Sequence, residues 1–192
     1  MCRCQYLFDT HSKTTTLPNT LSDVAKTFLS SDRRSVIYGN MIVSYLDSAV
    51  TGIGDLTSES IENGTYQITH PTMFVPRTIY EEFGGFDESF NIGADREFVL
   101  RLAAAGIKFV KLEQPLARFF LGGASSQTSL RFALEQSLDE FKIARRYYPL
   151  ITAIKITWAM FFRLFRNAAL SWFISDHEFL LRKVERVKGR DL

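Results

Sequence analysis

GGFDESFNIGADREF, at residues 84–98, is the stretch on which the assignment of this 192-residue chain depends. It places Asp87 just after a glycine pair, and it places Asp95 where a helix is expected to begin. A carboxylate that is fixed at the end of a secondary-structure element can take a proton from a hydroxyl group in a reproducible geometry. The stretch therefore makes Asp95 a candidate general base.

Hydrophobic periodicity on either side of this stretch predicts an α/β protein. Gly84 and Gly106 are expected to end helices, because glycine is common just past a helix C-terminus. No internal repeat interrupts the pattern. The expected elements, in chain order, are helix 17–30, strands 35–45, 49–53 and 72–75, helices 78–83 and 95–105, strands 107–112 and 117–121, and helices 128–147 and 151–174.

Three segments together resemble family 2 glycosyltransferases, which are inverting enzymes of the GT-A fold. They are the stretch at 84–98, ITHPTMF at 68–74 and RFFLGGASS at 118–126. The resemblance covers roughly residues 17–130, the second, acceptor-side half of such a catalytic domain. It implies a partial GT-A (Rossmann-like) mixed sheet that lacks its N-terminal nucleotide-binding strands.

The same resemblance divides the chain into three parts. An irregular N-terminus is expected at 1–16, the partial GT-A catalytic domain at 17–130, and a basic amphipathic helical tail at 131–192.

The resemblance implies that Asp95 is the catalytic base that deprotonates the acceptor hydroxyl. The other residues that it implicates are expected to bind substrate: Asp87, Gly85, Phe86, His70, Arg96, Arg118, Gly122, Gly123 and Ser125. The residues alone leave structural interpretations open. Asp95 could cap the helix, Asp87 could support the Gly-Gly turn, and a lone histidine more often satisfies a hydrogen bond than serves chemistry.

The implied reaction transfers a sugar from a nucleotide-diphospho-sugar to a hydroxyl of a glycan or lipid-linked glycan, as in polysaccharide biosynthesis. Complete family enzymes are expected to use Mg²⁺ or Mn²⁺, held by a D-x-D in the donor half. This sequence has no D-x-D. We therefore expect a truncated transferase, and the alternative is a non-catalytic transferase remnant that acts as a membrane- or partner-binding module.

Charge separates the tail from the rest of the chain. Residues 1–140 carry a net charge of −5 and residues 141–192 carry +7. Within the helix predicted at 151–174, cations and aromatic residues fall on different arcs. Such segregation favours an anionic membrane surface as a partner, although packing on the protein itself stays open. Nucleic acid is not expected, because no recognised binding motif accompanies the charge.

Cysteine usage and the N-terminus indicate a compartment. The two cysteines, Cys2 and Cys4, form no zinc pattern and no disulfide framework, which is typical of a reducing environment. The first residues lack the apolar run of a signal peptide. The sequence thus predicts a cytoplasmic protein, peripheral at the inner face of the membrane if the tail binds lipid.

Overall fold

The computed structural model describes residues 14–90, 92–121 and 130–170. Four strands form an open mixed sheet in the order β1–β4–β2–β3. β4 (Phe109–Phe120) pairs antiparallel with β1 (Thr14–Thr16) and parallel with β2 (Val36–Tyr45). β2 in turn forms an antiparallel hairpin with β3 (Ser48–Gly52). The α/β class predicted from the sequence is confirmed, and β1 lies at the end of the segment that was expected to be irregular.

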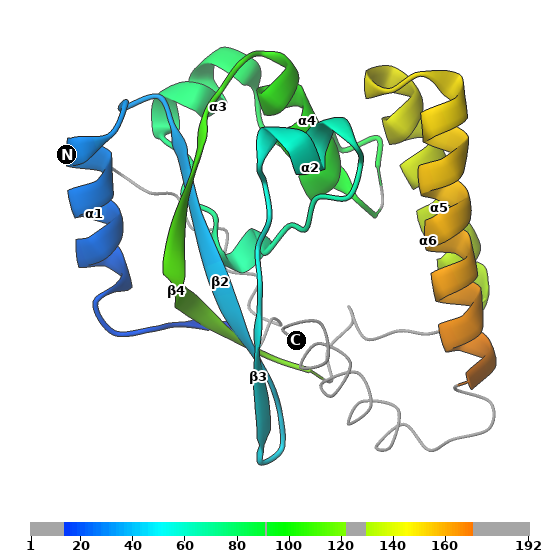
Figure 1. Ribbon diagram of the computed structural model, residues 1–192, viewed down its shortest axis with the longest axis horizontal. Coiled ribbons are helices and arrows are strands. Elements are labelled where there is room, and N and C mark those ends of the chain that lie inside the picture. Colours follow the sequence, from blue (N-terminus) through cyan, green and yellow to red (C-terminus); the bar gives the residue numbers. More distant parts are fainter. Residues whose placement is uncertain (1–13, 91, 122–129, 171–192) are drawn as a thin grey trace.

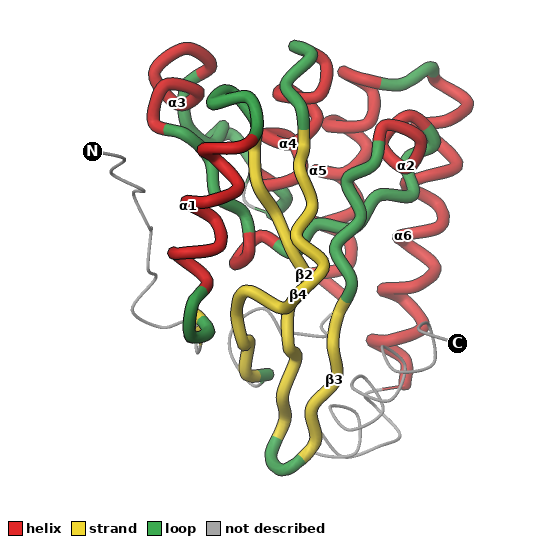
Figure 2. Tube along the Cα trace, turned by 60° about the vertical axis from the view of Figure 1, so that its left-hand side comes forward, coloured by secondary structure: helices red, strands yellow, loops and turns green. Residues whose placement is uncertain are grey.

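Helices lie on both sides of this sheet (Figure 1). α1 (Thr20–Ser30) is on one side, and α4 (Ala94–Ala104) is on the other. Beyond α4 stands an antiparallel pair of long helices, which the turned view in Figure 2 also separates from α1 by the sheet. The two helices of this pair are α5 (Leu130–Tyr147) and α6 (Leu150–Leu170). The other helices are short: α2 (Ser58–Glu62), α3 (Arg77–Phe83) and the 3₁₀ helix His70–Thr72.

β2 is the central strand of the core, because both of its faces are covered. Val36 packs with Phe98 and other side chains in a cluster on the α4 side. Ile37, the next residue, packs with Val24 of α1 in a cluster on the opposite face. Successive side chains of a strand point to opposite faces, so a strand covered on both sides reads as a continuous apolar run.

A bulge in β4 explains an error in the sequence-based prediction. Residues 39, 40 and 41 of β2 pair with residues 112, 115 and 117 of β4, so β4 carries extra residues at this point. A Cβ on Gly39 would lie 2.6 Å from Cδ1 of Leu116, and this close approach requires glycine. The two strands predicted at 107–112 and 117–121 are therefore one strand with a bulge.

Two predictions between β3 and α3 were wrong. The loop expected at 54–64 contains α2, which begins where Oγ1 of Thr57 accepts the backbone N–H of Ser60 at 3.2 Å. The strand expected at 72–75 is reduced to a single bridge between Phe74 and Ile37. Residues 70–72 instead form a 3₁₀ turn, because the Thr72 hydroxyl donates inward to a carbonyl of β2 at 2.6 Å.

The long helices α5 and α6 pack against each other as an antiparallel pair (Figure 1). α5 lies next to α4, and the first residues of the segment predicted as a tail thus contact the α/β part of the chain. No helix within the described ranges is long and apolar enough to cross a membrane.

Candidate functional site

Asp95 lies in the first turn of α4, where the sequence predicted it. The N-cap of this helix is Gly93, whose φ of 98° is in the left-handed region that favours glycine. Asp95 is half-buried, and its Oδ1 accepts the backbone N–H of Arg96 at 2.9 Å. A carboxylate in the first turn is stabilised by the positive end of the helix dipole. The capping position itself belongs to Gly93, so Asp95 is a first-turn residue rather than the N-cap.

Arg96, the next residue, points into the protein and pairs with α5. Its Nε lies 2.8 Å from Oε2 of Glu140, whose side chain is only 3% exposed. The guanidinium also stacks over the ring of Tyr66 at 4.6 Å. Burial by itself would lower the pKa of Arg96, but Glu140, with Tyr66 and Asp95, together outweigh burial and raise it. Arg96 was expected to bind substrate; its contacts are those of a residue that fixes the start of α4 against α5.

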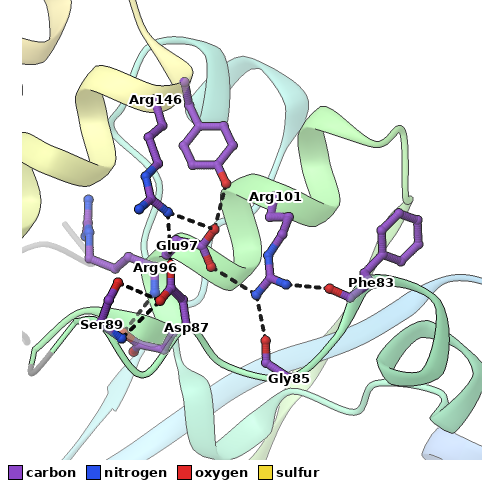
Figure 3. A network of polar contacts seen from close by, with 10 residues as sticks. Phe83, Gly85, Asp87, Ser89, Arg96, Glu97, Arg101 and Arg146 are labelled. Carbon is purple, nitrogen blue, oxygen red and sulfur yellow. Dashed lines mark hydrogen bonds and ion pairs between the residues drawn. The ribbon is translucent and has the colours of Figure 1, made fainter.

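Arg101, five residues further along α4, holds the start of the α3–α4 loop (residues 84–93). Its guanidinium donates to the carbonyl of Phe83 and, at 2.7 Å, to the carbonyl of Gly85 (Figure 3). The same guanidinium donates to Oε2 of Glu97 at 3.0 Å. The backbone of Gly85 is thus engaged through its carbonyl, while a Cβ at this position would meet nothing within 4 Å.

Glu97 is the buried carboxylate at the centre of these contacts. Its side chain is 3% exposed, and Oε1 accepts the hydroxyl of Tyr147 at 2.8 Å. Arg146 of α5 approaches the same oxygen at 3.9 Å (Figure 3). Burial, together with the hydrogen bond to Glu97, raises the pKa of Tyr147 to about 12. A buried carboxylate is tolerated here because cations and a hydroxyl surround it.

α5 holds the second half of the α3–α4 loop. Nη1 of Arg146 donates to Oδ2 of Asp87 at 3.0 Å, and its guanidinium stacks over the ring of Phe90 at 4.8 Å. Asp139, nearly buried, accepts the backbone N–H of Ile92 at 3.1 Å. The loop that leads into Asp95 is therefore held by α4 at its start and by α5 along its length.

Asp87 is a turn residue with an engaged carboxylate. Oδ1 accepts both the backbone N–H and the hydroxyl of Ser89, at 3.0 Å and 2.6 Å, and Oδ2 accepts from Arg146. These hydrogen bonds, the Ser89 hydroxyl first among them, lower the pKa of Asp87 to about 2. The structure thus contains the turn that the sequence allowed for Asp87. Its expected contact with acceptor hydroxyls stays a prediction.

His70 and Phe86 come together from separate segments. The two rings meet edge to face with centroids 5.4 Å apart, and Phe86 packs in turn on Phe98 of α4 at 5.2 Å. His70 is exposed, whereas Phe86 is half-buried. The contact brings the ITHPTMF segment to the α3–α4 loop, so two of the three segments that carry the family resemblance are neighbours in space.

The third segment is described only in part. Arg118 lies on β4 opposite Ile42 of β2, and its Nη1 donates to Oγ of Ser44 at 3.3 Å. The structure therefore places Arg118 with the sheet rather than with α4 and α5. Gly122, Gly123 and Ser125 lie outside the described residues.

Several residues that organise this site were not singled out from the sequence. They either join α5 to α4 and to the α3–α4 loop or hold that loop on α4: Glu97, Arg101, Asp139, Glu140, Arg146 and Tyr147. Glu97 and Arg101 are four residues apart in a helix, and that spacing is the one signal that predicts an ion pair. The other contacts join residues distant in the chain.

The described residues form no group of three or more His, Cys, Asp or Glu side chains that could hold a metal ion. The acidic groups near α4 are instead paired with arginines or with backbone N–H groups.

Comparison of the sequence with models of known protein families gave no match, and comparison with curated proteins gave none either. The resemblance to family 2 glycosyltransferases thus remains a prediction from the quoted segments.

Proposed function

We propose that this chain is the acceptor side of an inverting glycosyltransferase, with Asp95 as the general base. The reaction would move a sugar from a nucleotide-diphospho-sugar to a hydroxyl of a glycan or lipid-linked glycan. The observation that carries the proposal is the position of Asp95. Its carboxylate lies in the first turn of α4, is half-buried, and follows a loop that two helices hold in place.

The chemistry asked of Asp95 is the removal of one proton. The acceptor hydroxyl attacks the anomeric carbon from the side opposite the nucleotide, and the carboxylate takes the hydroxyl proton. As the new bond forms, the bond between the anomeric carbon and the diphosphate oxygen breaks, and the nucleoside diphosphate leaves with that electron pair. A positioned carboxylate contributes roughly 10²–10⁴-fold to such a step. The N–H of Arg96 at 2.9 Å orients the carboxylate and uses only one of its roughly four acceptor sites.

The surrounding ion pairs support the proposal by fixing the position of this base. Arg96 cannot rotate freely, because it is paired with Glu140 and stacked on Tyr66. Arg146 and Arg101 fix the loop that leads to α4 at Asp87 and Gly85. Catalytic groups lose orders of magnitude in rate when they are displaced by about 1 Å, so a rigid support of this kind suits a base.

Nucleotide-sugar and acceptor binding test the proposal directly. The full chain is titrated with a panel of nucleotide-diphospho-sugars, with and without Mn²⁺, and then with glycan acceptors, by calorimetry. Acceptor binding that weakens in Asp95→Asn, but not in the matched loop variant Glu88→Gln, is the expected result. Glu88 is an exposed carboxylate of the same loop. Equal acceptor binding by Asp95→Asn and Glu88→Gln would contradict an acceptor site at Asp95. The absence of acceptor binding to the parent chain would contradict it as well.

A further inference from the structure

α6 carries an exposed apolar stripe on the side turned away from the core. Trp158, Phe162 and Phe165 are between 48% and 60% exposed, and Ile151 and Ile154 extend the stripe toward the start of the helix. At about 100° per residue, these five positions fall within an arc of about 80°. Trp158 and Phe162 stack on each other at 5.2 Å, which makes a continuous aromatic surface.

A row of cations lies directly beside this stripe. Lys155, Arg163 and Arg166 are exposed and occupy the next arc of about 80° on the same helix. Residues 150–170 contain no aspartate or glutamate. The opposite side of α6, with Ala153, Met160 and Ala168, is buried. The exposed face is therefore apolar along one edge and purely cationic along the other.

This combination decides between possible occupants of the face. A second copy of the chain, packed symmetrically through α6, would bring three more cations and no carboxylate to the same interface. An anionic lipid surface offers both complements at once, because its phosphates attract cations and its interfacial region accepts aromatic side chains. Helices with these two edges lie in the plane of a membrane interface.

We propose that the exposed face of α6 binds the surface of an anionic lipid bilayer. Trp158, Phe162 and Phe165 enter the headgroup region, and Lys155 and Arg166 contact the lipid phosphates. The inference does not depend on the proposed transferase function. If that function is also correct, Glu140 and Arg96 connect the membrane-bound helix pair to the helix that carries Asp95.

Sedimentation with lipid vesicles tests this assignment on the full chain. Vesicles of phosphatidylcholine alone are compared with vesicles that contain phosphatidylglycerol, at low and high salt. Binding to the anionic vesicles that falls as salt rises is expected, since salt screens the attraction to the phosphates. The chain has two tryptophans, so the substitution Trp172→Phe leaves Trp158 as the single fluorescent one. Its emission is expected to shift to the blue when vesicles are added.

Three variants separate the contributions of the two edges. Lys155→Gln/Arg166→Gln is expected to lower the partition coefficient about thirtyfold, because each cation near an anionic surface contributes about fivefold. Trp158→Ser/Phe162→Ser is expected to lower it by at least tenfold. The matched control Leu29→Ser/Arg33→Glu changes an exposed leucine and an exposed arginine outside α6 and should leave binding unchanged. Arg163 is kept in all variants, because burial raises the pKa of the Glu140 carboxylate and the charge of Arg163 opposes that rise, so its removal would affect the α4–α5 contact.

The possible results distinguish the membrane from other partners. No binding at low salt would overturn the proposal, as would binding that the control variant loses as fully as the α6 variants. Self-association in sedimentation velocity that the Trp158→Ser/Phe162→Ser variant abolishes, without any vesicle binding, would assign the face to a second copy instead. Circular dichroism of each variant, unchanged from the parent chain, verifies that the comparison is between folded proteins.

Discussion

Where α5 meets α4, Arg96, Glu97 and Glu140 are paired inside the protein, whereas along α6 the cations lie at the surface beside exposed aromatic rings. The first region uses charge to fix one arrangement of two helices and a loop. The second has cations and aromatic rings that are exposed at the surface. The comparison shows that charge is paired inside the protein in the first region and is exposed at the surface in the second.

The two regions should respond to substitution in opposite ways. A change at the α4–α5 contact leaves a buried charge without its partner, which costs stability. A change on the exposed face of α6 removes surface that makes few internal contacts, which should leave stability nearly constant. The four predictions that follow probe the internal region, from the largest expected effect to the smallest.

Breaking the Arg96–Glu140 pair should have the largest effect. Glu140→Ala removes a carboxylate that is 3% exposed and leaves the half-buried Arg96 without its partner, so the free energy of unfolding should fall by about 3–5 kcal/mol. Urea denaturation measures the loss. Glu135→Ala, on the same helix, removes one partner of an exposed ion pair and should cost less than about 1 kcal/mol.

Equal losses in these two variants would mean that the buried pair does not hold α5 against α4. If Glu140→Ala fails to fold, the double variant Arg96→Met/Glu140→Leu answers the same question. Apolar side chains of similar volume often replace a buried ion pair at little cost, so this variant should fold.

Removing Arg101 should have the next largest effect. Arg101→Ala frees the carbonyls of Phe83 and Gly85 and leaves the Glu97 carboxylate with fewer donors, so about 2–3 kcal/mol should be lost. Amide hydrogens of the α3–α4 loop should also exchange faster with solvent. Arg77→Ala, which removes an exposed i,i+4 pair on α3, is the control and should cost under about 0.5 kcal/mol. Unchanged exchange in the loop would show that Arg101 does not restrain it.

The lowered pKa of Asp87 predicts a smaller effect on stability, and this effect depends on pH. Its pKa of about 2 in the folded protein lies below the ordinary value of 3.8, so its contribution to stability is present above pH 4 and is lost as pH falls through 2. Asp87→Asn should therefore unfold at a lower urea concentration than the parent chain at pH 6, and the difference should disappear near pH 2. A difference that stays constant over this range would rule out the ionised Asp87 as its cause.

Asp95→Asn should change stability least. The substitution removes a charge from the first turn of α4 but keeps an oxygen that can accept the N–H of Arg96. The loss should be about 0.5 kcal/mol, the amount typical of a first-turn carboxylate. Thermal unfolding measures it. A loss as large as that of Glu140→Ala would make Asp95 a structural residue.

Part of this site was predictable from the sequence. Gly84, Gly106 and the apolar spacing after Asp95 placed a helix that begins at Asp95, because backbone conformation and periodicity are local properties. The spacing of Glu97 and Arg101 on one helix was equally readable. The bulge in β4 could not be predicted, because it depends on how closely Leu116 of β4 packs against Gly39 of β2.

The contacts with α5 could not be predicted in this way. Arg96 and Glu140 are 44 residues apart, and Asp87 and Arg146 are 59 apart. Periodicity reports which face of a helix is apolar but not which helix it meets. The basic tail suggested a partner outside the protein. Its first helix, α5, instead supplies Glu140 and Arg146 as partners for residues of α4 and the α3–α4 loop.

Turnover by Asp95→Asn tests the central claim most directly. Transfer of a labelled sugar to a glycan acceptor is measured with the chain joined to a nucleotide-sugar-binding half, beside the same construction with Glu88→Gln. A positioned carboxylate base predicts that kcat falls by roughly 10²–10⁴-fold in Asp95→Asn, while Glu88→Gln retains the parent rate. Parent-level turnover in Asp95→Asn would contradict the assignment of this carboxylate as the base.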